Sequence, residues 1–418
     1  MSVVVEIVYP TCCGIDVHKN FLVACIAKTN ERGQTTHVMR RFSTNTGDLR
    51  KLADWLSTHH CKDVCMESTG KYWIPVFNIL EKTCNVCLTH PKYVKAIKGK
   101  KTDKKDAKWI AELFKCDLVR ASFIPPFDIR QLRDLCRYHA KLTHMVSSEK
   151  NRSQNCLTTC NFKLDAVFSD VFGKSATRIL DSLIAQGNSD FDVAPLMDKR
   201  CKATIEDVRA ALDGNLSYAQ AEKLKIIRLH MENLDNLKNT LENLIYRLAE
   251  QYQPQITLLL TVPGISSKLT AIRILAEIGT DMSVFETAKK LCSWAGLTPQ
   301  NNESAGKKKT TRITRAGVYL KPLLVQIALA VSSSAKHPEI RDKYYALKKR
   351  RGHKKAVIAI AHRLLAAIWH MLIKNEAYNP YLYNKADKPP ANRVLTPEQA
   401  FALLRSKGFQ IKEPDLVA

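Results

Sequence analysis

The sequence predicts an α/β domain followed by long helices and a second, largely helical domain. Residues 11–120 alternate short apolar runs typical of strands with amphipathic runs typical of helices. Residues 129–160 and 205–252 are polar-rich, and their apolar residues recur at helical spacing. A chain of 418 residues, 45% of them hydrophobic, is too long for one ordinary core and suggests two or three domains.

The first predicted domain covers residues 1–120. Three strands near 12–17, 21–28 and 36–42 are expected to form hairpins. The elements expected after them are a helix from Asp48 to His59, a strand at 63–67, a helix near 71–82, a strand at 85–90 and a helix from Asp103. Three hairpin-connected strands followed by alternating strands and helices is the order of an RNase H-like mixed sheet.

Residues 121–254 are the predicted linker and long helices, which follow a break at Pro125-Pro126. Leucines recur here every three and four positions, as in a coiled-coil seam: Leu234, Leu237, Leu241, Leu244 and Leu248. Packing within the chain and packing between subunits both explain this stripe. We favour an oligomer.

Residues 255–385 are the second predicted domain. Val262-Pro263-Gly264-Ile265, followed by apolar residues at helical spacing, predicts a helix-hairpin-helix. The backbone amides at Gly264 and the next helix N-terminus could then face a phosphate, although Pro-Gly turns are also common in purely structural settings. A polar loop is expected over Gln300 to Thr311, and residues 386–418 are expected to be a weakly structured tail.

Four carboxylates stand where a metal-dependent nuclease needs them. Asp16 lies on the first predicted strand, and Glu67 ends the strand at 63–67. Asp103 and Asp106 are three residues apart, which places them on one face of a helix. Carboxylate oxygens are the ligands that hard divalent ions prefer, and two Mg²⁺ ions about 3.5 to 4 Å apart can clamp the reacting oxygens of a phosphodiester. We expect the four residues to share one site.

Each acidic residue also has a purely structural interpretation. Asp103 with Asp106 could be an N-cap and a first-turn acid that stabilise a helix. Asp16 could end a strand before a turn, and Glu67 could cap the helix near 71–82. The order strand, strand, helix favours the shared site.

The chain is strongly basic, with 65 Lys and Arg against 40 Asp and Glu and a net charge of +25. Such a surplus is expected of a protein that faces a polyanion. Three basic runs favour contacts to a nucleic-acid backbone, with affinity that falls as salt rises. The first includes Lys95, Lys101 and Lys105, the second includes Lys307, Lys308, Lys309, Arg312 and Arg315, and the third spans residues 348–355.

The thirteen cysteines are scattered, which fits reduced core thiols better than a disulfide framework. Cys84 and Cys87, with Cys61 and Cys65 upstream, could form a zinc site, but their spacers are strand-like. No stretch is expected to reach the roughly 18 apolar residues of a membrane span, and the first ten residues lack a basic leader with a long apolar core. We expect a cytosolic protein with no membrane partner.

Ser304 is a candidate nucleophile within the polar loop. It lies among small residues and is followed by three lysines, whose charges could stabilise its ionised form and a phosphorane-like transition state. Loops rich in Ser, Gly and Lys are usually just solvated, so the residues alone leave both interpretations open.

These motifs together resemble the insertion-sequence one-ten family of transposases. The first half resembles its DEDD domain in Gly14-Ile15-Asp16-Val17-His18-Lys19, Met66-Glu67-Ser68-Thr69-Gly70-Lys71-Tyr72-Trp73, His90-Pro91 with Lys95, and Lys101-Thr102-Asp103-Lys104-Lys105-Asp106-Ala107. The second half resembles its carboxy-terminal transposase domain in Val262-Pro263-Gly264-Ile265, Ala276-Glu277-Ile278-Gly279, Trp294-Ala295-Gly296-Leu297-Thr298-Pro299, Ser304-Ala305-Gly306 and Arg312-Ile313-Thr314-Arg315-Ala316-Gly317.

The resemblance implies a RuvC-like first domain and an enzyme that cleaves and rejoins DNA. It also implies that the four carboxylates hold Mg²⁺, two ions in all, and that Ser304 forms a transient phosphoserine link to DNA. The implied partners are donor and target DNA, a structured non-coding guide RNA and a second copy of the chain. The oligomer would be a dimer or tetramer in which the middle helices join the subunits and the site is composite.

Two other functions are compatible with the residues. A RuvC-like structure-specific endonuclease, such as a junction resolvase, would use the four carboxylates to hydrolyse DNA with water. A non-catalytic nucleic-acid scaffold would use the basic runs alone. A protein–DNA adduct that disappears in Ser304→Ala would separate the transposase from the resolvase.

Overall fold

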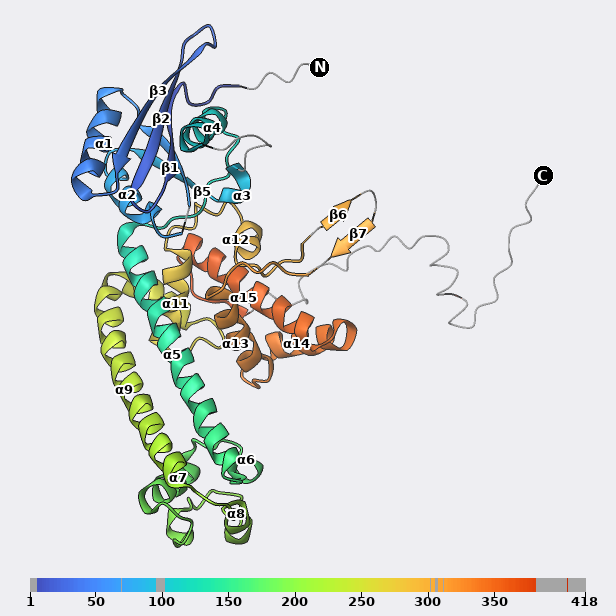
Figure 1. Cartoon of the computed structure of the whole chain (residues 1–418). Coiled ribbons are helices and arrows are strands. Elements are labelled where there is room, and N and C mark those ends of the chain that lie inside the picture. Colours follow the sequence, from blue (N-terminus) through green and yellow to red (C-terminus); the bar gives the residue numbers. More distant parts are fainter. Residues whose placement is uncertain are drawn as a thin grey trace. The chain divides into compact units, whose positions relative to one another are not determined.

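Figure 1 shows the computed structural model of the chain, which describes residues 6–68, 70–94, 102–300, 302–304, 307–310, 312–380 and 404. For Tyr93 and for residues 302–304 and 307–309 it describes the backbone alone. The chain forms two compact units. Unit 1 comprises Met1–Thr257 and Ser267–Glu286, and unit 2 comprises Leu258–Ser266 and Thr287–Ala418.

Unit 1 begins with a five-stranded mixed sheet in the order β3-β2-β1-β4-β5. Strand β1 pairs antiparallel with β2 and β2 with β3, whereas β4 is parallel to β1 and β5 is parallel to β4. All five strands were predicted to within one residue at each end. They are β1 (Thr11–Val17), β2 (Phe21–Thr29), β3 (Thr35–Ser43), β4 (Asp63–Glu67) and β5 (Asn85–Thr89).

The composition of each strand follows from its place in the sheet. Strands β1 and β2 are buried over most of their length, so their sequences are nearly continuous apolar runs. Strand β3 is an edge strand and is largely exposed, and it carries Arg40 and Arg41. Charged side chains on an edge strand discourage pairing with other chains.

Helices cover both faces of this sheet (Figure 1). The helices α1 (Thr46–Thr58) and α2 (Trp73–Leu80) pack on one face, where Ile15 and Met66 are buried. Helix α4 (Asp103–Lys115) packs on the other face, against Cys12 and Cys65. Because side chains alternate along a strand, Asp16 and Glu67 project to the α4 side.

Gly14 lets α4 lie close to the sheet. A Cβ atom at this position would lie 2.3 Å from the Ala107 carbonyl oxygen and 2.3 Å from the Ala111 nitrogen. Real side chains do not tolerate such contacts with backbone atoms, so α4 can approach β1 this closely only over a glycine. The contact brings the start of α4 towards Asp16.

Two long helices form the middle of unit 1. Helix α5 (Phe127–Thr159) matches the prediction of a helix over 129–160, and α9 (Tyr218–Leu248) lies beside it (Figure 1). They run antiparallel, because His139 pairs with Glu242 at 2.8 Å while Glu149, further along α5, pairs with His230, earlier in α9, at 3.1 Å.

The prediction of one continuous helix over 205–252 is wrong. The segment divides into α8 (Ile205–Ala211) and α9, and the chain turns between them. At the turn, the Asn215 N–H donates to the Cys160 carbonyl, and a Cβ on Gly214 would lie 2.4 Å from that oxygen. Ser217 then caps α9 by accepting from the Gln220 N–H.

The predicted leucine seam is also corrected. Leu234 and Leu241 are buried against α5, but Leu237 and Leu244 are 53% and 40% exposed. In a helix of 3.6 residues per turn, a residue three positions on lies about 60° around the axis. The buried face of α9 therefore uses Ala221, Leu224, Ile227, Leu234, Leu241 and Ile245.

A second core lies where α5 ends and α9 begins. Phe162 and Leu183 are almost fully buried in it. The small elements around it are α6 (Leu164–Val167), α7 (Lys174–Gln186), η1 (Ala194–Leu196) and α8. Near the other end of α5, Arg137 holds both carboxylate oxygens of Glu277 in α11 (Lys268–Ile278) at 2.7 and 2.8 Å.

Unit 2 is largely helical, as predicted for the carboxy-terminal part. The helix α15 (His353–Lys374) packs with the other helices of this unit, which are α12 (Ala288–Trp294), α13 (Leu320–Ser332) and α14 (Pro338–Arg351). Two short elements, η2 (Glu250–Tyr252) and α10 (Gln253–Leu260), come before α11 in the chain. In unit 1, the short helix α3 (Pro91–Val94) follows β5.

The predicted polar loop over 300–311 contains a hairpin instead. Strand β6 (Asn302–Ser304) pairs antiparallel with β7 (Lys307–Thr310), and Ser304 is the register partner of Lys307. Only Ala305 and Gly306 lie between the strands in the sequence, and a two-residue connection with glycine is typical of a hairpin. Polar composition alone concealed the pairing.

Within the described residues, α15 is the one helix long and apolar enough to cross a membrane by length and composition, contrary to the expectation that no stretch qualifies. Half of its apolar window is buried inside the fold, which is typical of a core helix.

The cysteines are free thiols. Cys61 and Cys84 lie in the core on the α1 side of the sheet, whereas Cys65 and Cys87 lie on the α4 side, so the four cannot share a zinc ion.

Candidate metal centre

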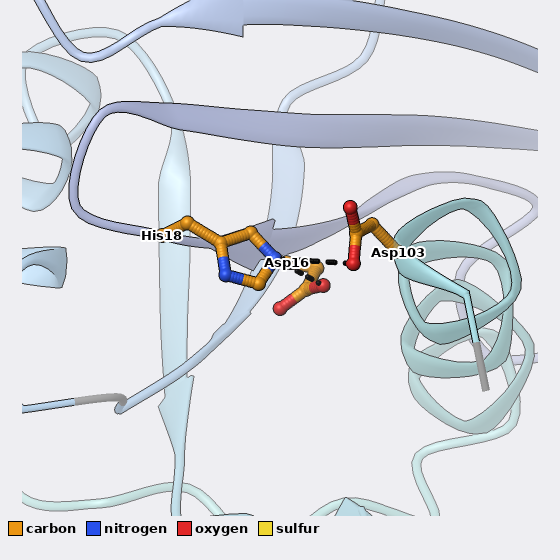
Figure 2. A group of neighbouring side chains, drawn as sticks. All are labelled: Asp16, His18 and Asp103. Carbon is orange, nitrogen blue, oxygen red and sulfur yellow. Dashed lines mark hydrogen bonds and ion pairs between the residues drawn. The ribbon is translucent and has the colours of Figure 1, made fainter.

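Asp16, His18 and Asp103 meet at the edge of the sheet next to α4 (Figure 2). The Nε2 atom of His18 lies 3.1 Å from Oδ2 of Asp16 and 3.4 Å from Oδ1 of Asp103. Each residue offers one ligand atom, and these three atoms lie within 4.8 Å of one another. The end of β1 and the start of α4 therefore converge, while a site shared by all four acids stays a prediction.

The electrostatics of Asp16 reflect a crowded acidic site. Asp16 is buried, and this burial is the main cause of a carboxyl pKa above its usual value. His18 opposes the shift, while the carboxylates of Asp106 and Asp103 add to it by repulsion. Asp106 is thus close enough to Asp16 to interact with its charge. A divalent cation would relieve this repulsion.

Thr102 determines how Asp103 and Asp106 are presented. It is the N-cap of α4, and its side chain accepts from the Lys105 N–H at 3.4 Å. The interpretation of Asp103 as the N-cap is therefore wrong. Both acids lie in the first turn of the helix, where negative charge is favourable, and Asp103 turns towards His18.

Glu67 lies on the same side of the sheet as Asp16. Ile15 is the register partner of Met66 in the parallel pair of β1 and β4, so Asp16 and Glu67 occupy the next positions on neighbouring strands. Neighbouring strands are about 4.8 Å apart. Glu67 is half-buried and is outside the group of three. It does not cap α2, whose N-cap is Tyr72.

His18 was missed as a site residue by sequence reasoning, which assigned it to a turn. The available signal was its position just after β1 and two residues after Asp16, where a side chain can lie close to the Asp16 carboxylate. Its backbone N–H donates to the Phe21 carbonyl at 2.9 Å, and its ring contacts the Phe21 ring in a tilted arrangement with centroids 4.6 Å apart.

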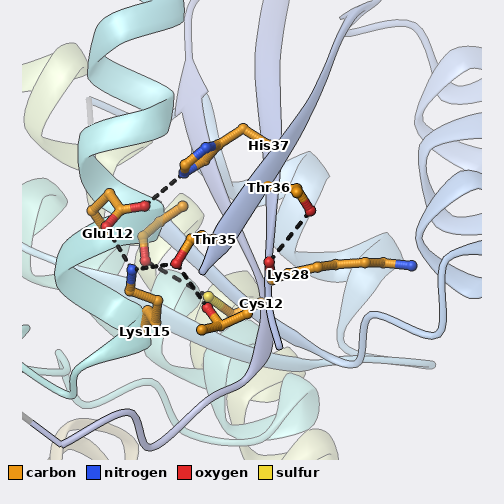
Figure 3. A network of polar contacts seen from close by, with 9 residues as sticks. Cys12, Lys28, Thr35, Thr36, His37, Glu112 and Lys115 are labelled. Atoms are coloured by element: carbon orange, nitrogen blue, oxygen red, sulfur yellow. Dashed lines mark hydrogen bonds and ion pairs between the residues drawn. The ribbon is translucent and has the colours of Figure 1, made fainter. Parts of the chain in front are cut away.

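The far end of α4 is fastened to strand β3 by a polar network (Figure 3). Glu112 accepts from His37 at 2.6 Å and from Lys115 at 2.7 Å, and Lys115 also donates to Thr35 at 3.0 Å. Burial acts to raise the pKa of Glu112, but Lys115 and His37 outweigh it and lower the pKa. This network and Gly14 together fix the helix that carries Asp103 and Asp106.

The predicted nucleic-acid contacts are only partly described. Lys105 is exposed on α4, and Arg312 and Arg315 are exposed in unit 2. Lys95 and Lys101 lie outside the described residues, and only the backbone of Lys307, Lys308 and Lys309 is described, in β7.

Gly264 has a φ of +83°, and a Cβ there would lie 3.0 Å from Ile327 in α13. Close packing of its backbone is therefore a sufficient reason for a glycine at this position, and the phosphate contact remains a prediction.

Ser304 ends β6 in unit 2, whereas the acidic residues belong to unit 1. The side chain of Ser304 lies outside the described atoms. Its role as a nucleophile therefore stays a prediction.

Two protein-family models match the chain. A model described as a transposase, for the DEDD domain of IS110 elements, matches residues 13–162, and a model described as transposase IS116/IS110/IS902 family matches residues 256–345. Together these ranges contain the acidic cluster, the Gly264 turn and Ser304.

Several curated proteins are similar to the chain. A transposase for insertion sequence element IS1111A from Coxiella burnetii is 31% identical over 121 residues, 28% of this chain and 33% of that protein. An insertion element IS900 protein from Mycobacterium paratuberculosis is 32% identical over 29% of this chain and 31% of its own length. The pilin gene-inverting protein of Moraxella bovis is 24% identical over 88% of this chain and 98% of its own length.

Both family models are described as transposases, and their matches lie in both halves of the chain, so the class they define is that of the transposases. Within this class, the chain belongs to the IS110 family of transposases, which confirms the resemblance seen in the sequence. The match spans only about a third of the IS1111A and IS900 proteins.

Proposed function

We propose that the protein cleaves and rejoins DNA strands to excise and insert a mobile element. The observation that carries this proposal is the cluster of Asp16, His18 and Asp103, with Asp106 close enough to repel Asp16 and with Glu67 on the same face of the sheet. The pilin gene-inverting relative supports rejoining as well as cleavage, because an inversion requires both.

Asp16, Glu67, Asp103 and Asp106 would hold Mg²⁺, two ions in the proposed state. The donor set fits, since the buried Asp16 offers a carboxylate oxygen at ligand spacing to Asp103 and His18, and the charges of Asp103 and Asp106 repel that of Asp16. When bound, divalent ions stabilise the charge on the attacking and leaving oxygens of a phosphodiester. The carboxylates themselves would hold and orient the ions at the ends of β1 and β4 and the start of α4.

A RuvC-like assignment for the first domain is supported by the order β3-β2-β1-β4-β5 and by the antiparallel start of the sheet. A helix-hairpin-helix is supported by the turn at Gly264 between α10 and α11. We keep the proposed division into residues 1–120, 121–254, 255–385 and 386–418.

Ser304 is the proposed nucleophile. Its oxygen would form a bond to the scissile phosphorus while the bond from phosphorus to the leaving deoxyribose oxygen breaks, and the leaving oxygen would take up a proton. A deoxyribose hydroxyl of another strand would then displace Ser304 and reseal the backbone without ATP. Three lysines follow Ser304 within five residues, and their charge would stabilise the phosphorane-like transition state.

The proposed partners are donor and target DNA, a structured non-coding guide RNA and further copies of the chain. The net charge of +25 supports a polyanionic partner. The exposed Leu237 and Leu244 on α9 support packing between subunits, in a dimer or tetramer whose composite site joins the carboxylates of one copy to Ser304 of another. The protein would act on DNA in the cytoplasm.

Trapping of a covalent intermediate tests the nucleophile. The full chain is incubated with DNA carrying an insertion junction and with Mg²⁺, then denatured and separated by electrophoresis. We expect a protein–DNA adduct that disappears in Ser304→Ala and persists in the matched control Ser293→Ala. Strand cleavage with no adduct in the wild-type chain would favour the junction resolvase, and DNA binding without any strand chemistry would favour the scaffold.

A further inference from the structure

We propose that His18 is a direct ligand of the metal and that its nitrogen makes the centre prefer a transition-metal ion such as Mn²⁺ over Mg²⁺. The inference rests on the proposed function, because it concerns the ion that Asp16 and Asp103 would hold. A centre built from the four carboxylates alone would have no nitrogen ligand, so it would not predict this preference for a transition-metal ion.

The geometry places the His18 nitrogen as a ligand would lie. Two ligands at neighbouring positions of an ion with bonds of about 2.1 Å are about 3 Å apart. Nε2 of His18 lies 3.1 Å from the nearest oxygen of Asp16 and 3.4 Å from that of Asp103. An ion bound by both carboxylates would therefore have the imidazole within its reach.

The imidazole is held in position by its own hairpin. The His18 backbone N–H donates to the Phe21 carbonyl, and the two rings are in contact, tilted by 33°. The guanidinium of Arg41, on the neighbouring strand β3, lies 3.8 Å from the centre of the Phe21 ring. These contacts do not require a bound ion, so the ligand is oriented in advance.

The mixed donor set determines the metal preference. Mg²⁺ favours oxygen ligands and octahedral water, whereas imidazole nitrogen suits first-row transition ions. Mn²⁺ shares the preference of Mg²⁺ for carboxylates but is itself a first-row transition ion, so a nitrogen ligand favours it over Mg²⁺. Removal of the imidazole should therefore weaken Mn²⁺ binding more than Mg²⁺ binding.

Pulsed electron paramagnetic resonance on the full chain tests the ligand directly. Mn²⁺ bound to the wild-type chain should show a ¹⁴N modulation, which should change to ¹⁵N when the histidines are ¹⁵N-labelled. The modulation should vanish in His18→Ala and remain in His144→Ala, which removes an exposed histidine on α5. In His18→Ala the Kd for Mn²⁺ should rise on the order of tenfold, while the Kd for Mg²⁺ from competition should change much less.

Bound Mn²⁺ without nitrogen modulation would overturn the inference, as would equal weakening of both ions in His18→Ala. The labelled wild-type chain gives this result even if the variant does not fold. Asp16→Asn separates the two proposals. If it abolishes Mn²⁺ binding while the wild-type chain shows no nitrogen signal, only the role of His18 fails. If the wild-type chain binds no divalent ion, the proposed metal centre fails with it.

Discussion

At the scale of single residues, the site depends on charges that are unfavourable without a cation. Asp16 is buried beside Asp103 and Asp106, and burial together with their repulsion raises its carboxyl pKa. A fold retains such a cluster at a cost in stability, and a bound divalent ion offsets that cost. Glu67 and Asp106 lie outside the group of three, so substituting them tests more strictly whether all four acids share one site.

Glu67→Gln and Asp106→Asn should each reduce strand cleavage by about 100-fold or more, because each removes a carboxylate ligand while keeping the side-chain volume. Initial rates on labelled DNA at saturating Mg²⁺ measure this. The matched control is Asp48→Asn, which neutralises an acid in the first turn of α1 paired with Lys51. Wild-type rates in Glu67→Gln would remove that residue from the site.

His18 shows why the ligand set was only partly predictable from the sequence. The carboxylates were found because acidic residues within apolar runs are conspicuous. The role of His18 depends on its distance to Asp103, 85 positions later in the chain, and no local pattern contains that distance.

At the scale of elements, two contacts hold α4 to the sheet. Gly14 of β1 lies under Ala107 and Ala111 in the middle of the helix, and Glu112 binds His37 of β3 near its end. The contact at Gly14 is steric and should respond to an added side chain. The contacts of Glu112 are electrostatic and should respond to removal of its charge.

Gly14→Ala should destabilise unit 1 by about 3 kcal/mol, since the added Cβ would meet backbone atoms of α4 at 2.3 Å and overpacking must be relieved by moving the helix. Chemical denaturation measures the free energy of unfolding. Gly47→Ala in α1 is the control, because a Cβ there meets nothing within 4 Å. Equal stabilities of the two variants would contradict the close approach of α4.

Glu112→Gln should remove a stabilising contribution that depends on pH. The folded-state pKa of Glu112 is lowered below the ordinary glutamate value of 4.5, so its contribution is fully present above about pH 4.5 and is lost as the pH falls through the lowered folded value. The difference in melting temperature between wild type and variant, measured from pH 7 down to pH 3, should therefore shrink on acidification. A constant or growing difference would show that Glu112 does not act through its charge.

The elements also show where sequence patterns suffice. Strands β1, β2 and β5 were predicted closely because burial on one or both faces favours apolar residues at regular positions in each run. The break between α8 and α9 was missed because it depends on Gly214 meeting Cys160, a contact between distant segments. The hairpin of β6 and β7 was missed because lysine and asparagine are uncommon in strands.

At the scale of the whole molecule, the proposed chemistry needs both units. Unit 1 carries the acidic cluster and the long helices, and unit 2 carries Ser304 and the third basic run. The resemblance in both halves is what predicted this combination, since neither composition nor periodicity links a serine to four distant acids. The proposed composite site predicts that activity depends on assembly.

The double variant Leu237→Glu and Leu244→Glu should lower the molar mass of the assembly without unfolding the chain, because both side chains are exposed on α9. Light scattering measures the mass, and circular dichroism reports the helix content. Leu118→Glu, at an exposed position outside the long helices, is the control. An unchanged mass would exclude these leucines from the subunit contact.

The most direct test of the central claim is strand cleavage by Asp16→Asn. The variant keeps the size of a buried side chain that contacts His18 and lies beside α4. On DNA bearing an insertion junction, with Mg²⁺ or Mn²⁺, we predict wild-type affinity in a binding assay and no detectable cleaved strands on a denaturing gel. Cleavage by the variant at the wild-type rate would contradict the account.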